Sequence, residues 1–217
     1  ATFTNFAMSG IDKLHFGLEA AVSIPLYRSL ALNGAVSWGQ YTYDSNPYYL
    51  QTQDNSGDIV SDGYVYWKDF RVESTPQTAV NVGLSWRSNN NIYLSADFNY
   101  YNNMYLSMSP IYRTDAVITT GMTAEDIAHL RRQEKFDSAY TLNASIGKNW
   151  YIHRKYTLGF SLDVKNILNN QDIKTGGYEQ TRLSKNTETT VTTYQAFDSK
   201  YFYMFGTTYY LNLYFRF

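Results

Sequence analysis

Hydrophobic and polar residues alternate along seven segments of the chain. In the first segment, residues 12–24, the charged residues Lys13 and Glu19 stand at odd positions. The even positions are all apolar: Leu14, Phe16, Leu18, Ala20, Val22 and Ile24. Successive side chains of a β-strand point to opposite faces, so this spacing predicts a strand with one apolar and one polar face. The same pattern predicts further strands at residues 30–43, 77–87, 91–103, 138–149, 155–166 and 200–217.

The connections between these strands are alternately short and long. The short ones are Pro25–Ser29, Ser88–Asn90 and Tyr151–Arg154, and the long ones are residues 44–76, 102–137 and 167–199. The predicted strands are long enough to cross a bilayer, for which about 9–11 residues suffice. Long strands with short turns at one end and long loops at the other are typical of bacterial outer-membrane barrels, whose short turns face the periplasm. A soluble sandwich with Tyr-rich edges is the alternative.

Composition narrows the class of protein further. The formal net charge is -1, which favours no nucleic-acid partner, and Cys is absent, which excludes disulfides and thiolate metal sites. Aromatic residues reach 18%, with 22 Tyr, but no apolar run approaches the roughly 18 residues of a membrane helix. Residues 1–5 do not resemble a signal peptide. We therefore expect that targeting information was removed or that the chain begins inside a longer one.

The last predicted strand carries a second pattern at its end. Apolar residues occupy every second position up to a terminal aromatic residue: Tyr209, Leu211, Leu213, Phe215 and Phe217. This arrangement resembles the C-terminal assembly signal of outer-membrane barrels, although an apolar edge strand would have the same pattern. It implies a periplasmic C-terminus. Complete bacterial barrels have an even number of strands, so seven strands predict partners outside this set. Residues 1–9 are one candidate for an eighth strand, pairing with the final strand in a small closed barrel.

Several stretches resemble the C-terminal barrel region of TonB-dependent receptors, especially Bacteroidota receptors with a carboxypeptidase-regulatory-like N-terminal domain. They are residues 74–79, 133–136, 140–148, 163–171 and 175–180. The resemblance implies an all-β, transmembrane antiparallel barrel of about 22 strands, of which residues 1–217 form the C-terminal segment. It also implies a plug domain and a TonB-box, both absent from this chain. The implied partners are the remaining barrel and plug, outer-membrane lipid, the TonB complex and a surface lipoprotein.

Two groups of residues are candidates for contacts with ligands or partners. Aromatic side chains crowd the first long connection, where they suit a ligand or partner protein, or packing within the loop itself: Tyr48, Tyr49, Tyr64, Tyr66 and Trp67. Polar residues of the predicted strands fall on the lumen side, where plug contact is favoured over lining a transport path: Asp97, Asn99, Asn143, Ser145 and Asp163.

Catalytic and metal-binding patterns are weak by comparison. The three His residues show no metal-ligand spacing, and no Gly-x-Ser-x-Gly elbow occurs, so we expect neither an enzyme nor a cofactor. The acidic stretch 54–58 misses the EF-hand pattern and favours a solvated loop over a Ca²⁺ site. Thr123 and Asp126 have the spacing of a capping box, which predicts a short helix running to about Gln133.

The function that these patterns favour is TonB-dependent nutrient uptake at the bacterial outer membrane. In this interpretation the chain supplies barrel wall, lumen lining and extracellular loops, and the substrate stays open. One alternative is a receptor-like barrel that acts as a scaffold in an outer-membrane complex. Another is the small eight-stranded barrel, acting as an adhesin or stabiliser.

Overall fold

The computed structural model describes residues 3–118, 122–153, 155–185 and 192–217, and side chains of 183–194 are left out of the description. Strands dominate it, and every sheet is antiparallel. The strands are β1 (Thr4–Ser9), β2 (Lys13–Tyr27), β3 (Leu30–Tyr43), β4 (Tyr48–Gln53), β5 (Ile59–Tyr64), β6 (Thr78–Arg87), β7 (Ile92–Asn102), β8 (Ala139–Ile152), β9 (Tyr156–Lys165), β10 (Lys174–Lys185), β11 (Thr192–Tyr203) and β12 (Thr208–Arg216). The helices are η1 (Pro110–Arg113), α1 (Asp115–Ile118) and α2 (Ala124–Leu130).

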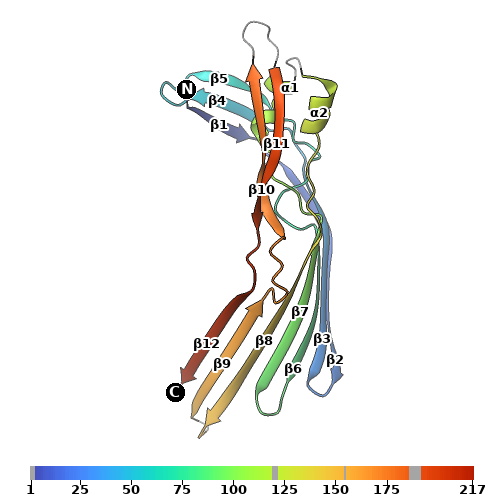
Figure 1. The fold of residues 1–217 in the computed structure, drawn as a ribbon, viewed down its shortest axis with the longest axis vertical. Coiled ribbons are helices and arrows are strands. Elements are labelled where there is room, and N and C mark those ends of the chain that lie inside the picture. Colours follow the sequence, from blue (N-terminus) through green and yellow to red (C-terminus); the bar gives the residue numbers. More distant parts are fainter. Residues whose placement is uncertain (1–2, 119–121, 154, 186–191) are drawn as a thin grey trace.

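Seven of these strands form one large open sheet (Figure 1). Its order is β12-β9-β8-β7-β6-β3-β2, so neighbours in the sheet follow one another along the chain except where the long connections intervene. Six of the seven predicted segments each correspond to one of these strands. The seventh, 200–217, was wrong as a single strand, because β11 ends at Tyr203 and β12 begins only at Thr208.

Three tight turns and the C-terminus lie together at one end of this sheet, which we call the turn end (Figure 1). Among the described residues of these turns, Arg28, Asn91 and His153 have positive φ, one in each turn. A left-handed residue reverses an extended chain within a few residues, and two-residue hairpin loops commonly need one. The long connections all lie at the opposite end, so the predicted alternation of short and long connections is confirmed.

The long connections are built from strands and helices, whereas the sequence predicted loops with one short helix in the second of them. We call this part, residues 4–9, 44–76, 103–138 and 167–207, the cap. In it β4 and β5 form a hairpin that β1 joins, giving a three-stranded sheet, and β10 pairs with β11. β1 is paired with β4 from Thr4↔Gln53 to Ser9↔Tyr48. Residues 1–9 were therefore wrongly predicted, in the small-barrel alternative, to pair with the final strand.

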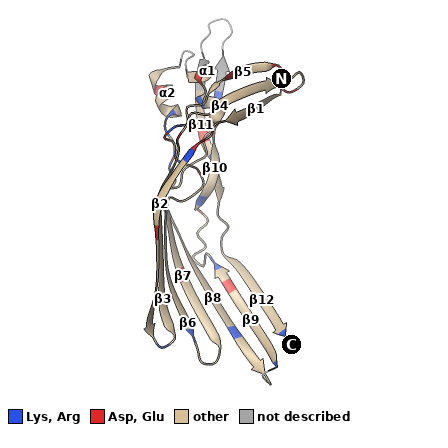
Figure 2. Cartoon of the chain, turned by 180° about the vertical axis from the view of Figure 1, so that it is seen from behind, with Lys and Arg blue, Asp and Glu red and all other residues tan. Residues whose placement is uncertain are grey.

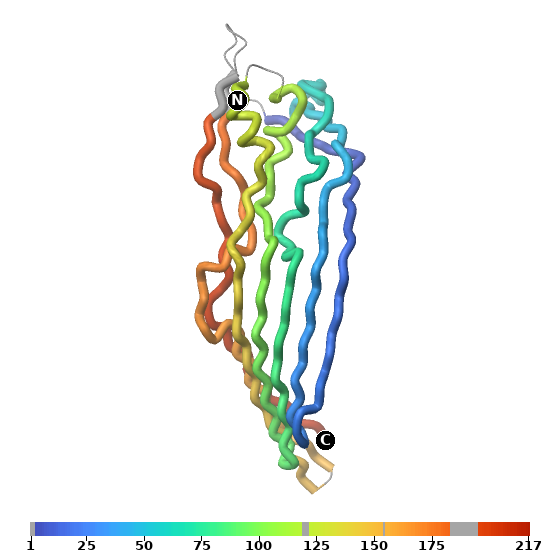
Figure 3. Tube along the Cα trace, turned by 90° about the vertical axis from the view of Figure 1, so that its right-hand side faces the viewer, coloured from blue at the N-terminus to red at the C-terminus, as the bar shows by residue number. Residues whose placement is uncertain are grey.

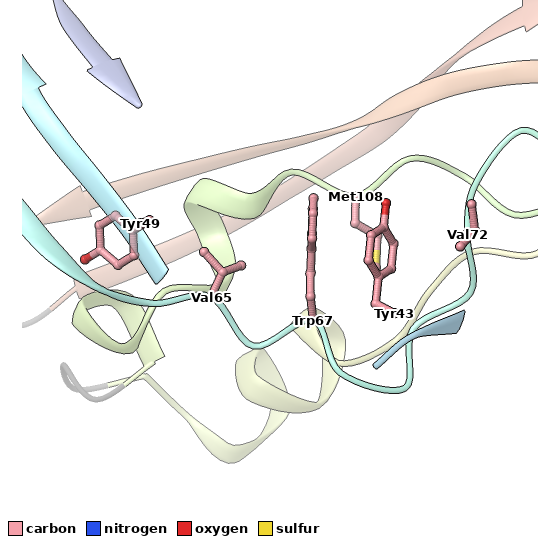
Figure 4. Close-up of a cluster of buried hydrophobic side chains, with 6 residues drawn as sticks. All are labelled: Tyr43, Tyr49, Val65, Trp67, Val72 and Met108. Carbon is pink, nitrogen blue, oxygen red and sulfur yellow. The ribbon is translucent and has the colours of Figure 1, made fainter. Parts of the chain in front are cut away.

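The buried core sits in the cap and at the adjoining strand ends, not between layers of the large sheet. One cluster, shown in Figure 4, consists of Tyr43, Tyr49, Val65, Trp67, Val72 and Met108. A second consists of Met104, Leu106, Phe136, Ala139 and Ile173. By contrast, every residue of β2 is exposed. Figure 3 shows the sheet as a single curved layer of strands running from the cap to the turn end.

The helical content is small and lies wholly in the cap. Thr123 caps α2: its Oγ1 accepts a hydrogen bond from Asp126 N at 3.2 Å, and Thr123 N donates to Asp126 Oδ2 at 3.2 Å. The predicted capping box is thus confirmed. The helix ends at Leu130 and not near Gln133, whose side chain instead bonds the backbone of Arg71 in both directions. Among the described residues, no helix combines the length and apolar character needed to cross a membrane.

Candidate functional site

The polar residues predicted to line a lumen share one face of the large sheet. Register places Asp97 opposite Asn143, and Ser145 opposite Asp163. Asn99 lies two positions from Asp97 on the same strand and therefore on the same face. The five residues come from β7, β8 and β9, three consecutive strands. The structure thus brings them onto one continuous surface.

Several polar groups on this face form hydrogen bonds. Ser95 and Ser145 hydroxyls lie 2.8 Å apart, and Asn99 Oδ1 accepts from Asn81 Nδ2 at 2.9 Å. Asn143 Oδ1 accepts a backbone hydrogen bond at 2.9 Å from Asn166, where the chain leaves β9. Three of the five predicted residues are therefore already engaged within the sheet.

The carboxylates of Asp97 and Asp163 differ from their neighbours. Neither makes a side-chain hydrogen bond or ion pair within the part of the chain that the structure describes. The Asp97 carboxylate lies over Gly83 of the adjacent strand, where an added Cβ would come within 2.3 Å of it. These two carboxylates therefore have unused capacity to accept hydrogen bonds or to pair with a cation.

The other face of the sheet is apolar and exposed. The residues of the predicted assembly signal all fall on it or at the end of its strand, with Leu213 69% and Phe217 94% exposed: Tyr209, Leu211, Leu213, Phe215 and Phe217. One row of apolar residues crosses four neighbouring strands of this face: Leu211, Leu162, Ile146 and Leu94, each paired with the next. An exposed apolar surface that continues across several strands is unusual for a soluble monomer.

The five aromatic residues of the first long connection separate into two groups. Tyr49 and Trp67 are buried, and the centroids of the Trp67 and Tyr43 rings lie 4.6 Å apart in the cap core. Tyr48, Tyr64 and Tyr66 are exposed. The buried pair matches the alternative of packing within the loop. Only the exposed three are accessible to a ligand or partner.

A buried arginine, missed by the sequence interpretation, joins all three long connections. Arg113 is 2% exposed and forms a two-bond ion pair with Glu179 of β10, at 2.8 and 3.0 Å. Its Nε donates to Leu130 O, at the end of α2, and Nη1 donates to Ser109 O, each at 2.9 Å. The guanidinium also lies over the Phe70 ring, with 5.5 Å between Cζ and the ring centroid. Arg113 is thus the central polar contact of the cap.

A pocket of about 510 Å³ opens beside this ion pair, between the α2 segment and the β10–β11 hairpin. Glu134 and Tyr201 line it, and the Tyr201 hydroxyl donates to Glu134 Oε1 at 2.7 Å. This hydrogen bond, helped by partial burial, raises the pKa of Tyr201 above its ordinary value. Lys174 Nζ lies 3.7 Å from the Tyr201 ring centroid. Glu134 and Glu179 both belong to stretches of receptor resemblance, and that was the available sequence signal for this pocket.

Asn166 organises the junction between the large sheet and the cap. It is 3% exposed with a left-handed backbone, and its Nδ2 donates to Asn170 O and Phe205 O at 2.9 and 3.1 Å. Its carbonyl accepts from Thr207 Oγ1 at 2.8 Å. These bonds hold the chain where β11 gives way to β12, which explains the interruption of the predicted final strand.

The acidic stretch 54–58 forms the turn between β4 and β5. Asp54 Oδ1 accepts a hydrogen bond from Asn5 Nδ2 at 2.9 Å, and Gly57 has positive φ. Among the described residues, no group of three or more His, Cys, Asp or Glu side chains is arranged to hold a metal ion.

Comparison with known proteins returned no relatives. No protein-family model, no curated protein and no solved structure matches this chain.

Proposed function

We propose that the seven-stranded sheet is part of the wall of a transmembrane β-barrel in a bacterial outer membrane. The observation that carries this proposal is a single-layer sheet with one exposed apolar face and one polar face. In water, each Å² of this apolar face left uncovered would cost about 25 cal/mol of free energy relative to burying it. Lipid on that side, and a wet or plugged lumen on the other, satisfy both faces.

The free edges of the sheet support a barrel larger than this chain. Within the described residues, β2 pairs only with β3, and β12 only with β9. Unpaired backbone groups in hydrocarbon cost several kcal/mol each, so lipid-exposed edges do not persist. Because β1 is used in the cap, further strands of the same receptor close the barrel.

The barrel belongs, in this proposal, to a TonB-dependent receptor that takes up a nutrient. The support is the resemblance of five stretches, three of which lie at structural junctions: Glu134 and Glu179 at the cap pocket, and Asn166 at the sheet–cap junction. The elaborate cap at the end opposite the turns suits an extracellular surface. Asp97 and Asp163 would meet basic groups of the plug inside the barrel.

Neighbouring residues on opposite faces test the membrane assignment. In the full-length protein cleared of other cysteines, Leu94→Cys and Ser95→Cys are compared in intact outer-membrane vesicles. We expect Leu94→Cys to resist maleimides in the membrane and to react only after the protein is fully denatured, because a thiol in hydrocarbon does not ionise. A charged aqueous maleimide should reach only Ser95→Cys, once the vesicles are opened and any plug is unfolded with urea. Equal aqueous labelling at both positions would refute the lipid-facing assignment.

The receptor assignment needs a separate test. Deleting the gene, or the energy-transducing TonB protein, should abolish growth on the same limiting nutrient. Growth unaffected by TonB loss, together with loss of a co-purifying complex on gene deletion, would favour the scaffold alternative.

A further inference from the structure

Positive charge without matching negative charge marks the turn end of the large sheet. The strands and turns of this end lie within residues 20–43, 74–96, 138–162 and 199–217, and none of these stretches contains Asp or Glu. Figure 2 shows blue but no red near the turn end, whereas acidic residues lie higher in the sheet and in the cap. An anionic partner therefore meets no Asp or Glu side chain in these stretches.

Besides Arg216, whose Cζ is 5.5 Å from the centroid of the Tyr214 ring on the polar face, three cations at this end each lie over an aromatic ring. Lys148 Nζ is 5.2 Å from the Trp150 ring centroid, and Lys155 Nζ is 5.4 Å from that of Tyr156. Arg28 Cζ is 5.1 Å from the centroid of its neighbour Tyr27. Such contacts hold a cation beside an apolar surface without removing its ability to bind an anion.

The rings of these three pairs belong to the apolar face. Trp150 lies opposite Leu158, and Tyr27 lies opposite Leu30, both apolar residues of that face. Tyr156 stacks on Phe215, with 5.8 Å between ring centroids. The pairs therefore stand at the lower margin of the apolar surface.

Lys148 itself interrupts the apolar face. Its register neighbours are Ile92 on β7 and Phe160 on β9. A lysine there buries its aliphatic stem along the apolar surface and extends its ammonium toward water. Within the described residues it has no carboxylate partner, so its charge is available to an outside anion.

We propose that Lys148–Trp150, Lys155–Tyr156 and Arg28–Tyr27 form a binding belt for the phosphates of anionic phospholipid headgroups. The belt would recognise the leaflet at the turn end. Trp and Tyr rings take up the level of the headgroups, and the cations beside them bind the phosphate. This inference rests on the proposed function, since it requires the apolar face to contact lipid.

Two further arginines at the same end supply a matched control. Arg87 lies opposite Tyr93 and Arg216 opposite Thr157, both on the polar face of the sheet. Their removal deletes the same charge from the same end but does not touch the lipid-facing belt.

The test uses the full-length protein and native mass spectrometry in an equimolar mixture of phosphatidylglycerol and phosphatidylcholine. We expect the unmodified protein to retain phosphatidylglycerol preferentially. In the variant Lys148→Gln/Lys155→Gln, the preference for phosphatidylglycerol should fall about fivefold for each cation removed. The variant Arg87→Gln/Arg216→Gln should stay within about twofold of the unmodified protein, because its charges face away from lipid.

Resistance to carbonate extraction from vesicles, measured first, separates two kinds of failure. A protein that does not insert would overturn the proposed function and this belt together. An inserted protein without a lipid preference, or with a preference that both double variants lose equally, would overturn the belt alone. The belt would also be overturned if the Lys148→Gln/Lys155→Gln variant kept its lipid preference but no longer sedimented with peptidoglycan. The two lysines would then bind the cell wall and not the lipid.

Discussion

Replacing Arg113 by Ala should open the cap of the protein. The substitution removes an ion pair with Glu179 and two hydrogen bonds to backbone carbonyls, all within a site where the arginine is 2% exposed. Removing one partner of a buried pair typically costs about 3–5 kcal/mol, because the other charge stays buried without compensation. Glu179 would keep only the hydrogen bond from Ser109 N at 3.0 Å.

The expected loss corresponds to an increase of more than about a hundredfold in the population of the open cap. Native-state hydrogen exchange of the full-length protein measures this directly, since amides of α2 and β10 exchange through that opening. Limited proteolysis between α2 and β8 gives an independent readout. The amides of β6 to β8 in the large sheet should be unaffected.

Two further variants make the reasoning refutable. Lys68→Ala removes an exposed ion pair in the same cap, in which Lys68 Nζ lies 4.0 Å from Asp44 Oδ1. Its loss should lower the stability of the cap by less than about 1 kcal/mol. Arg113→Met/Glu179→Leu removes both buried charges and should recover much of the stability lost in Arg113→Ala. If Arg113→Ala exchanges no faster than Lys68→Ala, the arginine does not hold the three connections together.

Three further predictions concern the sheet, its junction and the cap pocket. Leu211→Lys should reduce assembly into the outer membrane, because a lysine on the lipid face costs up to about 2–4 kcal/mol near the bilayer midplane. The control Asn212→Lys, on the opposite face, should assemble normally. Equal membrane yields of the two variants would place both faces in the same environment. Asn166→Ala should speed exchange at the β12 amides near Thr207 by removing the bonds to Asn170 and Phe205, at about 1–3 kcal/mol; unchanged exchange would mean that these bonds do not hold the junction. The pKa of Tyr201 is raised in the folded protein, so its hydroxyl stabilises the cap fully below pH ~10. That stabilisation is lost as the pH rises through the pKa of the folded protein. Tyr201→Phe should therefore reduce the alkaline loss of hydrogen-exchange protection in the cap. An identical alkaline profile in Tyr201→Phe would exclude that hydroxyl as the cause.

The strands of the large sheet were predictable because one residue in two must face each side. That constraint fixed the register of residues such as Lys13 and Glu19, and six segments appear as strands near their expected limits. The final segment was predicted as one strand because its alternation continues locally. Its interruption is caused by Asn166, which is about forty residues away in the chain.

The cap was not predictable in the same way. β10 and β11 are rich in polar residues on both faces, so their pairing leaves little periodic signal. Arg113 looks like any surface arginine until Glu179 and Leu130 O are brought to it by folding. The aromatic cluster of the first connection was recognised, but sequence spacing alone does not distinguish the buried Tyr49 from the exposed Tyr48.

The central claim is that this sheet forms part of a larger closed barrel, and the intact mass of the protein purified from its native membrane tests it most directly. The account predicts a mass several times the 25.1 kDa of this chain, as expected for a plugged barrel of about 22 strands. A membrane-extracted protein of about 25 kDa would contradict it, because seven strands with two free edges would then have to satisfy themselves in lipid.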